Sequence, residues 1–190
     1  EEQNSLVEEL CRRGREKGEK IFVDPIMGDG GRLYNGMTGQ TVERMKGLCA
    51  WADVAIPNMT EAAFLADCYR GQPQVEAYQL REMAERICGL GARAVVITSA
   101  VVGGKSQVYG YEKESGKSFS VPYEQIPLRL PGTGDLFAAF LAGCCLRGMS
   151  LEGCVRKTVN ILERLILADQ KAGGGCKGIP VERYWEELGV

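Results

Sequence analysis

Three short apolar runs alternate with longer segments that have the spacing of helices, and this order restricts the chain to few folds. The runs cover residues 21–23, 53–58 and 94–99, and the first two end at Asp-Pro and Ile-Pro. Short buried strands separated by helices of ten or more residues are typical of βαβ units, whose strands lie parallel with both faces covered. The sequence therefore predicts an α/β fold with a mostly parallel central sheet.

Helical patterns and one hairpin pattern complete the predicted organisation. Two alternating apolar runs surround EKESGK at 112–117, which indicates an antiparallel hairpin at a sheet edge. With 190 residues, the chain has the length of one domain, which we expect to cover 1–190. Helices are predicted at 1–18, 41–52, 58–69, 74–92 and 151–173.

The composition excludes several classes of function. A net charge of -2 with interleaved charges gives no basic face for nucleic acid or for an anionic membrane. The chain has no histidine, so the residue that commonly binds zinc and that serves as the base in serine–histidine catalysis is missing. Eight cysteines without a C-x-x-C pattern indicate reduced thiols in a cytoplasmic protein. Cys144 and Cys145 are interpreted as core residues, with a redox role as the alternative.

Gly132-Thr133-Gly134-Asp135 stands directly before an apolar run that predicts a buried helix. The first N–H groups of a helix point outward, and glycines let an anion approach them closely. Asp135 beside such an anion site could take a proton from a hydroxyl during phosphoryl transfer. Alternatively, Thr133 only caps the helix and Asp135 only offsets its dipole. Both interpretations remain open at this point.

Polar residues follow the first predicted strand. Asp24 could help to position a metal ion, and Asp29 could organise the glycine-rich loop near nucleotide phosphates. Asp-Pro and Asp-Gly are also ordinary turn sequences, which is the structural alternative. Because ligands bind at the carboxyl ends of parallel strands, we expect this loop to belong to a site.

Two further strand ends carry candidate site residues. Asn58 and Glu61 have the N-x-x-E spacing of a capping box, although a glutamate in a strand-end crevice can also hold magnesium through water. Thr98 and Ser99 end the third apolar run and offer hydroxyl groups to a ligand, or they start the next turn.

Four motifs together resemble a known family. VDPIMGDGGRLY, ADVAIPNMTEAAFL, AVVITS and GTGDLFAAFLAG have the order and spacing of the pyridoxal kinases, the vitamin B6 branch of the ribokinase-like superfamily. The resemblance runs from about Lys20 to the last helix. It implies a ribokinase-like three-layer αβα sandwich that uses ATP and Mg²⁺ to phosphorylate the 5′-hydroxymethyl group of pyridoxal, pyridoxine or pyridoxamine. It leaves open an assisting monovalent cation.

The resemblance also implies roles for individual residues. Asp135 looks like the base that activates the hydroxyl, and the amides of Gly132, Thr133 and Gly134 look like the anion hole. Asp24 and Glu61 resemble the carboxylates around magnesium, which they contact directly or through water. The positions that resemble the lining of the nucleotide site are Asp29, Tyr34, Asn58, Thr98 and Ser99, with the stretch up to Leu130 near the adenine.

The chain departs from the family pattern in two places. Ile56 stands where the family usually has threonine, which removes a hydroxyl group near the phosphates. Family members also extend by roughly a further third before the position of Glu1, with the first strands and much of the vitamin pocket. We therefore expect a fragment or a truncated gene model, and a homodimer for the full-length protein.

Three alternatives to a pyridoxal kinase remain. A hydroxymethylpyrimidine (phosphate) kinase has a similar fold and similar D-P and P-N-x-x-E stretches, but usually a cysteine at the position of Asp135. A sugar kinase of the superfamily would share G-x-G-D without the D-P-x-M-G-D run. A catalytically silent nucleotide-binding module belongs to another class, which a kinase assay distinguishes.

Overall fold

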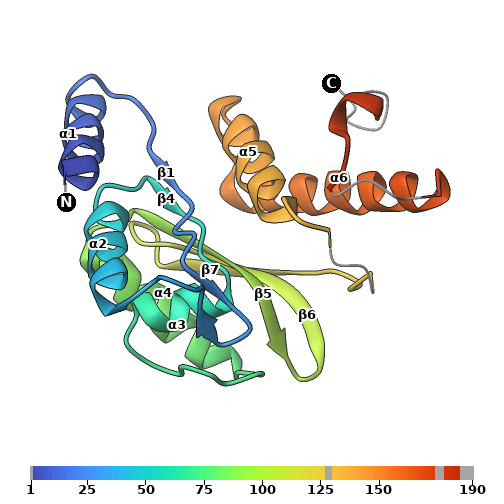
Figure 1. Ribbon diagram of the computed structural model, residues 1–190, viewed down its shortest axis with the longest axis horizontal. Helices are drawn as coiled ribbons and strands as arrows, with labels where there is room; N and C mark the ends of the chain where they lie inside the picture. Colours follow the sequence, from blue (N-terminus) through green and yellow to red (C-terminus); the bar gives the residue numbers. More distant parts are fainter. Residues whose placement is uncertain (1, 127–129, 174–177, 185–190) are drawn as a thin grey trace. The chain divides into compact units, whose positions relative to one another are not determined.

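The computed structural model describes residues 2–126, 130–173 and 178–184 (Figure 1). The chain forms two compact units, with the boundary between Pro122 and Tyr123. The helices are α1 Glu2–Glu16, α2 Gly39–Cys49, α3 Met59–Leu65, α4 Ala77–Leu90, α5 Thr133–Leu146 and α6 Leu151–Lys171, with a 3-10 turn η1 at Val181–Arg183. The strands are β1 Phe22–Val23, β2 Gly28–Asp29, β3 Arg32–Leu33, β4 Val54–Ala55, β5 Ala94–Val102, β6 Lys105–Glu112 and β7 Lys117–Pro122.

The first unit is built on a five-stranded sheet in the order β1-β4-β5-β6-β7. Strands β1, β4 and β5 run parallel, as the alternation of strands and helices predicts. Strands β6 and β7 form the predicted hairpin around 112–117, and their pairing is antiparallel. The mixed sheet with parallel strands and a late hairpin is therefore confirmed.

The antiparallel part of the sheet is larger than the sequence predicts. Strand β5 does not end at Ser99 but continues to Val102, and it turns directly into β6. Gly103 and Gly104 form this turn with φ angles of 55° and 75°, a conformation that favours glycine. The expectation that Thr98 and Ser99 end the strand is wrong, because they lie at a register shift inside β5.

Helices α2, α3 and α4 form one group beside the sheet (Figure 1). The apolar stripe of α4 buries Leu80, Met83 and Ile87 completely in one core with Val95 and Ile97 of β5. Fully burying such a side chain stabilises the fold by about 1.5–3 kcal/mol. This core fixes the strand ends that carry the predicted site residues.

Helix α3 is shorter than the predicted segment 58–69. It ends at Leu65, and Asp67 and Tyr69 follow with φ angles of 53° and 55°. These left-handed conformations cannot continue a right-handed helix, so the chain turns here.

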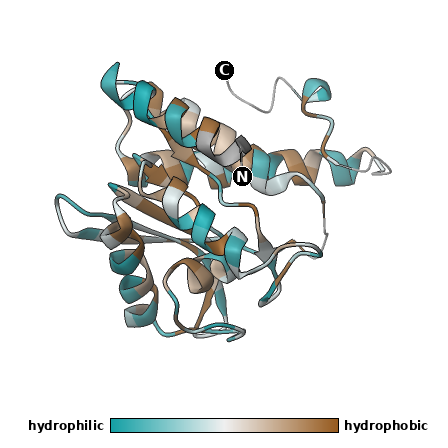
Figure 2. Cartoon of the chain, turned by 60° about the vertical axis from the view of Figure 1, so that its left-hand side comes forward, coloured by the Kyte–Doolittle hydropathy of each residue, from teal (hydrophilic) through white to brown (hydrophobic). Residues whose placement is uncertain are grey.

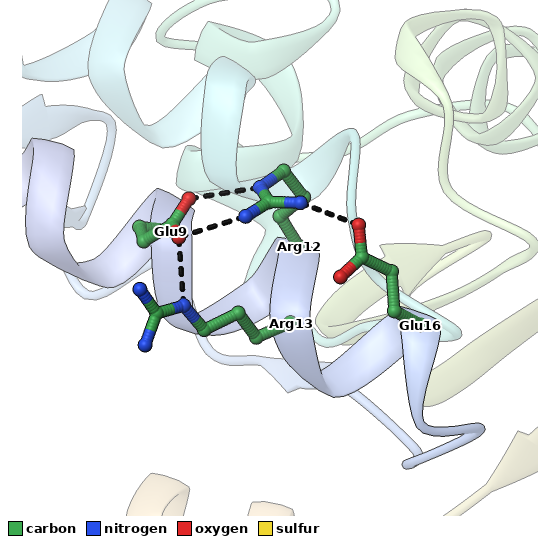
Figure 3. A network of polar contacts seen from close by, with 4 residues as sticks. All are labelled: Glu9, Arg12, Arg13 and Glu16. Atoms are coloured by element: carbon green, nitrogen blue, oxygen red, sulfur yellow. Dashed lines mark hydrogen bonds and ion pairs between the residues drawn. The ribbon is translucent and has the colours of Figure 1, made fainter.

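Helix α1 carries a network of ion pairs on its exposed side (Figure 3). Arg12 and Arg13 both donate to the carboxylate of Glu9, and these hydrogen bonds lower the pKa of Glu9 to about 2. Arg15 donates to the carbonyl oxygen of Trp51 at 2.9 Å and lies over its ring, which ties α1 to the segment after α2.

The second unit contains the helices α5 and α6 and the turn η1. Its helices α5 and α6 pack against each other, and Ile161 and Leu165 of α6 form a small core with Phe140 and the segment around η1. Tyr184 donates a hydrogen bond to the buried Asp169 at 3.1 Å. The long helices carry both hydrophilic and hydrophobic residues (Figure 2). Within the described ranges, no helix is both long and apolar enough to cross a membrane.

Close packing at Gly110 gives a test of the sheet. Phe119 of β7 is the register partner of Gly110, and a Cβ atom added at Gly110 would lie 2.1 Å from the ring. We expect Gly110→Ala to lower the free energy of unfolding by about 1–3 kcal/mol, because the ring must move. Gly89→Ala is the matched control, since its Cβ in α4 meets nothing within 4 Å, and it should stabilise by up to about 1 kcal/mol. Urea denaturation measures both variants, and equal effects would contradict this packing.

Candidate functional site

The carboxyl ends of β1 and β4 lie beside the middle of β5. The register pairs Val23 with Ala55 and Ala55 with Val95, so β1 and β4 leave the sheet at one place while β5 continues to Val102. Asp24 directly follows β1, and Asn58 pairs with Thr98 in an isolated parallel bridge. The sheet thus brings together the polar residues that follow the strands, as the sequence predicts for a ligand site.

The glycine-rich segment after Asp24 is a small hairpin rather than an irregular loop. Strands β2 and β3 are joined by Gly30 and Gly31, whose φ angles are 59° and 80°. Two positive φ angles in a two-residue turn require glycine-like residues, and the D-G-G sequence was a signal for this turn. The hairpin carries Asp29, which is exposed, and Tyr34 follows directly after it.

Glu61 holds this hairpin through backbone hydrogen bonds. Its side chain is buried, with 3% exposure, and its Oε1 accepts from the N–H groups of Met27 at 3.0 Å and Gly28 at 3.4 Å. Its Oε2 accepts from the N–H of Asn58 at 2.9 Å, while Asn58 Oδ1 accepts from the N–H of Glu61 at 3.0 Å. The predicted capping box is therefore present, and the same carboxylate also reaches the hairpin.

Two more side chains of the α3 terminus hold the hairpin. Asn58 Nδ2 donates to the carbonyl oxygen of Gly28 at 2.8 Å, and the N–H of Gly31 donates to Thr60 Oγ1 at 2.9 Å. Thr60 belongs to the candidate site, and the sequence did not indicate it. Its partner is 29 residues away in the chain, so no local pattern could reveal it. Gly31 is also close to Gly71, because a Cβ at Gly31 would lie 3.2 Å from the Cα of Gly71.

Several carboxylates lie close enough to influence one another. Burial raises the pKa of Glu61 to about 7, against its backbone hydrogen bonds, and the charge of Asp24 adds to the increase. Burial also raises the pKa of Tyr34, and the charges of Asp29, Glu61 and Asp24 contribute. The structure therefore brings these four predicted residues into one electrostatic neighbourhood.

This neighbourhood suits a magnesium ion that keeps most of its water. Within the described residues, no three His, Cys, Asp or Glu side chains form a ready metal cluster. Magnesium needs only one or two carboxylates when water and phosphate complete its shell. Asp24, half-buried at the end of β1, and the buried Glu61 provide two such carboxylates. Ile56, which stands where the family usually has threonine, is 4% exposed and provides an apolar side chain in place of a hydroxyl group.

Thr98 and Ser99 lie at the irregular point of β5. The N–H of Thr98 donates to the carbonyl oxygen of Pro57 at 2.9 Å, which continues the parallel pairing beyond β4. Ser99 is exposed and has a φ angle of 56°, a conformation that is uncommon outside glycine. Such backbone strain often accompanies a binding site, which supports the predicted role of this segment.

The second unit contains the G-T-G-D turn. Gly132 is the N-cap of α5 with a φ angle of 86°, so glycine is needed there. Thr133 is the first helical residue and does not cap the helix, which corrects the capping alternative. Gly134 has open space around it, since an added Cβ would meet nothing within 4 Å. Asp135 is exposed in the first turn, and its Oδ2 lies 3.9 Å from the Cβ position of Gly132.

The remaining predicted site residue is Leu130. It is half-buried and lies two residues before Gly132, in the second unit. Residues 127–129 of the stretch predicted near the adenine lie outside the described residues.

The fold and the strand-end residues define an α/β protein of the kind that binds small molecules at the carboxyl edge of its sheet. Residues 1–180 match the phosphomethylpyrimidine kinase family, and the chain belongs to this family.

Curated relatives include pyridoxal kinases. The chain is 34% identical over 159 residues to the pyridoxal kinase of Arabidopsis thaliana, an alignment of 80% of this chain and 50% of that protein. It is 28% identical over 154 residues to the pyridoxine/pyridoxal/pyridoxamine kinase of Bordetella avium, covering 80% of this chain and 51% of that one. The chain thus spans about half the length of the curated relatives it matches.

Solved structures show the same fold. A Bacteroides thetaiotaomicron protein assigned as a phosphomethylpyrimidine kinase, in a crystal form with pyridoxal, has a TM-score of 0.87 and 27% identity, covering 99% of this chain and 67% of that one. The pyridoxal kinase of Leishmania donovani, in complex with ADP and pyridoxamine, has a TM-score of 0.77 and 27% identity, covering 99% and 64%. The predicted ribokinase-like fold and the resemblance to pyridoxal kinases are confirmed.

The raised pKa of Glu61 predicts a pH-dependent stability. Because the folded protein binds this proton more tightly than the unfolded chain, the contribution is complete below pH 4.5 and is lost as the pH rises through about 7. We expect the unfolding free energy of the wild type, relative to Glu61→Gln, to fall by up to about 3 kcal/mol between pH 4.5 and 8. Urea denaturation at several pH values measures this fall in the free energy of unfolding. The exposed Glu114→Gln is the control and should follow the wild type; an identical pH profile for Glu61→Gln would contradict the burial effect.

Proposed function

We propose that the protein acts as a pyridoxal kinase, which transfers the γ-phosphate of ATP to the 5′-hydroxymethyl group of pyridoxal, pyridoxine or pyridoxamine. The observation that carries this proposal is the start of α5, where Gly132 turns the chain and Asp135 stands exposed in the first turn. The names of the curated relatives, and the pyridoxal and pyridoxamine in the two solved structures, support the substrate class.

The N–H groups of Gly132, Thr133 and Gly134 supply the donors for the transferred phosphate. They belong to the first turn of α5, where backbone N–H groups have no partner within the helix and the dipole favours a negative charge. Asp135 accepts the proton of the attacking hydroxyl, because a carboxylate within hydrogen-bond reach acts as a general base. Phosphoryl transfer needs alignment and charge stabilisation more than covalent chemistry, so a chain without histidine can support it.

The strand-end residues of the first unit serve the nucleotide and its metal. Asp24 and Glu61 hold magnesium, directly or through water, and magnesium supplies charge neutralisation for the phosphate oxygens. Asp29, Asn58 and Thr98 contact the nucleotide phosphates, together with Tyr34 and Ser99. The β2–β3 hairpin is fixed by hydrogen bonds with Asn58, Thr60 and Glu61, which keep Asp29 in position.

Three further predictions belong to the same proposal. The two compact units form parts of one ribokinase-like kinase domain in residues 1–190. Leu130 belongs to the adenine end of the nucleotide site. The full-length protein is a cytoplasmic homodimer. A kinase assay that compares potassium salts with sodium salts tests whether a monovalent cation assists the reaction.

A kinase assay on the purified chain tests the function. We expect phosphate transfer from ATP to pyridoxal or pyridoxamine in the presence of magnesium, and loss of transfer when EDTA removes the metal. Faster turnover of hydroxymethylpyrimidine than of pyridoxal would favour the alternative activity that the family description suggests. Nucleotide binding by calorimetry without turnover of either compound would favour a catalytically silent module.

Asp135→Asn separates the catalytic from the structural interpretation of the G-T-G-D turn. We expect kcat to fall by about two to four orders of magnitude with fold and ATP affinity retained, because the base is lost and the shape is kept. Glu152→Gln is the matched control, since Glu152 is also an acid in the first turn of a helix. Loss of a helix-dipole contact costs about 0.3–1 kcal/mol of stability in either variant. Unchanged kcat in Asp135→Asn would leave Asp135 with this structural role only.

A further inference from the structure

A tight connection joins α5 to α6 and fixes the geometry of three cysteines. Gly148 has a φ angle of 79°, and its N–H donates to the carbonyl oxygen of Cys145 at 3.0 Å. Two residues later, Ser150 caps α6 by accepting from the N–H of Gly153 at 3.3 Å. Both helix ends are therefore closed by hydrogen bonds, so the side chains on their facing turns have defined positions.

Two of the cysteines face each other across this connection. The Sγ atoms of Cys145 and Cys154 lie 3.5 Å apart, and Cys154 Sγ also donates to the carbonyl oxygen of Met149 at 3.6 Å. Cys145 is half-buried, whereas Cys154 is fully buried. Cys144, the neighbour of Cys145 in the sequence, points to another side of α5, because adjacent residues in a helix do not face each other.

We propose that Cys145 and Cys154 form a thiol–disulfide exchange site, which takes a small-molecule disulfide such as oxidised glutathione and becomes a cross-link between α5 and α6. The earlier interpretation of the adjacent cysteines as core residues holds for Cys144, which is 7% exposed. Cys145 instead contacts a thiol of the next helix, a relationship that the sequence spacing does not show.

The exchange proceeds in two balanced steps. The thiolate of Cys145 attacks one sulfur of oxidised glutathione, its S–S bond breaks, and one glutathione leaves as a thiolate that takes up a proton. Cys154 then gives up its proton and its thiolate attacks Cys145 Sγ, the S–S bond between Cys145 and glutathione breaks, and the second glutathione leaves as a thiolate that takes up this proton. Two protein thiols are oxidised, and one small-molecule disulfide is reduced to two thiols.

The burial of the two sulfurs determines the order of these steps. Solvent reaches Cys145, so it meets the small disulfide first. Burial raises the pKa of Cys154 to about 12, and its hydrogen bond with Cys145 adds to this increase, so Cys154 is protonated while Cys145 makes the first attack. Cys154 is thus the resolving residue of the pair.

The exchange site is separate from the G-T-G-D turn. Cys145 follows Asp135 by ten residues in α5, which corresponds to about 15 Å along the helix axis. The exchange site therefore does not depend on the proposed kinase activity, and its test needs no turnover.

Peptide mapping of the native full chain tests the proposal. The protein is incubated with oxidised glutathione, the remaining thiols are alkylated, and trypsin releases peptides 130–147 and 148–156. We expect these two peptides to be joined by a disulfide that dithiothreitol reverses. Cys144→Ser should keep this cross-link, while Cys145→Ser should lose it. Cys154→Ala, whose fold is checked by circular dichroism, should stop at the mixed disulfide of Cys145 with glutathione.

Two results would overturn the proposal. One is an equal yield of linked peptides from Cys144→Ser and Cys145→Ser, which would show that the pairing of Cys145 is not selective. The other is the formation of the link only in urea, which would show that the folded connection does not bring the thiols together.

Discussion

The buried carboxylate of Glu61 is the interaction on which the candidate site of the first unit depends. A buried carboxylate is stable only when hydrogen bonds or charges compensate for its lost hydration. Here three backbone N–H groups compensate it, and two of them come from the glycine-rich hairpin. One side chain therefore closes the start of α3 and fixes the loop that follows β1. Asn58 and Thr60 strengthen the same attachment from the same helix turn.

This arrangement explains how a capping motif can also belong to a candidate functional site. The N-x-x-E spacing has a sufficient structural role, and the structure confirms it. The same hydrogen bonds hold the hairpin next to Tyr34, whose pKa is raised by burial and by the charges of Asp29, Glu61 and Asp24. A preorganised group of oxygen ligands suits a hydrated magnesium ion and phosphate, since little reorganisation is needed when they bind. Structural and functional interpretations of Glu61 are therefore compatible.

The periodicity of the sequence predicted most of the fold, because strands and helices have different hydrophobic periods. The three parallel strands, the hairpin around 112–117 and the long helices are present where the pattern indicated them. The differences concern positions where backbone conformation matters more than periodicity. Strand β5 continues through the polar pair Thr98 and Ser99 with a register shift between Ile97 and Ala100, and α3 ends early, before residues with positive φ angles.

The sequence by itself determined the types of residue at the carboxyl ends of the strands and at the start of α5. It also determined the family, since four motifs in one order are far more specific than any single motif. Only the tertiary structure decided which partners these residues have. Thr60 contacts Gly31, and Cys145 contacts Cys154 rather than Cys144. Such pairings depend on how separate elements pack, and local sequence spacing does not encode the distance between atoms on different elements.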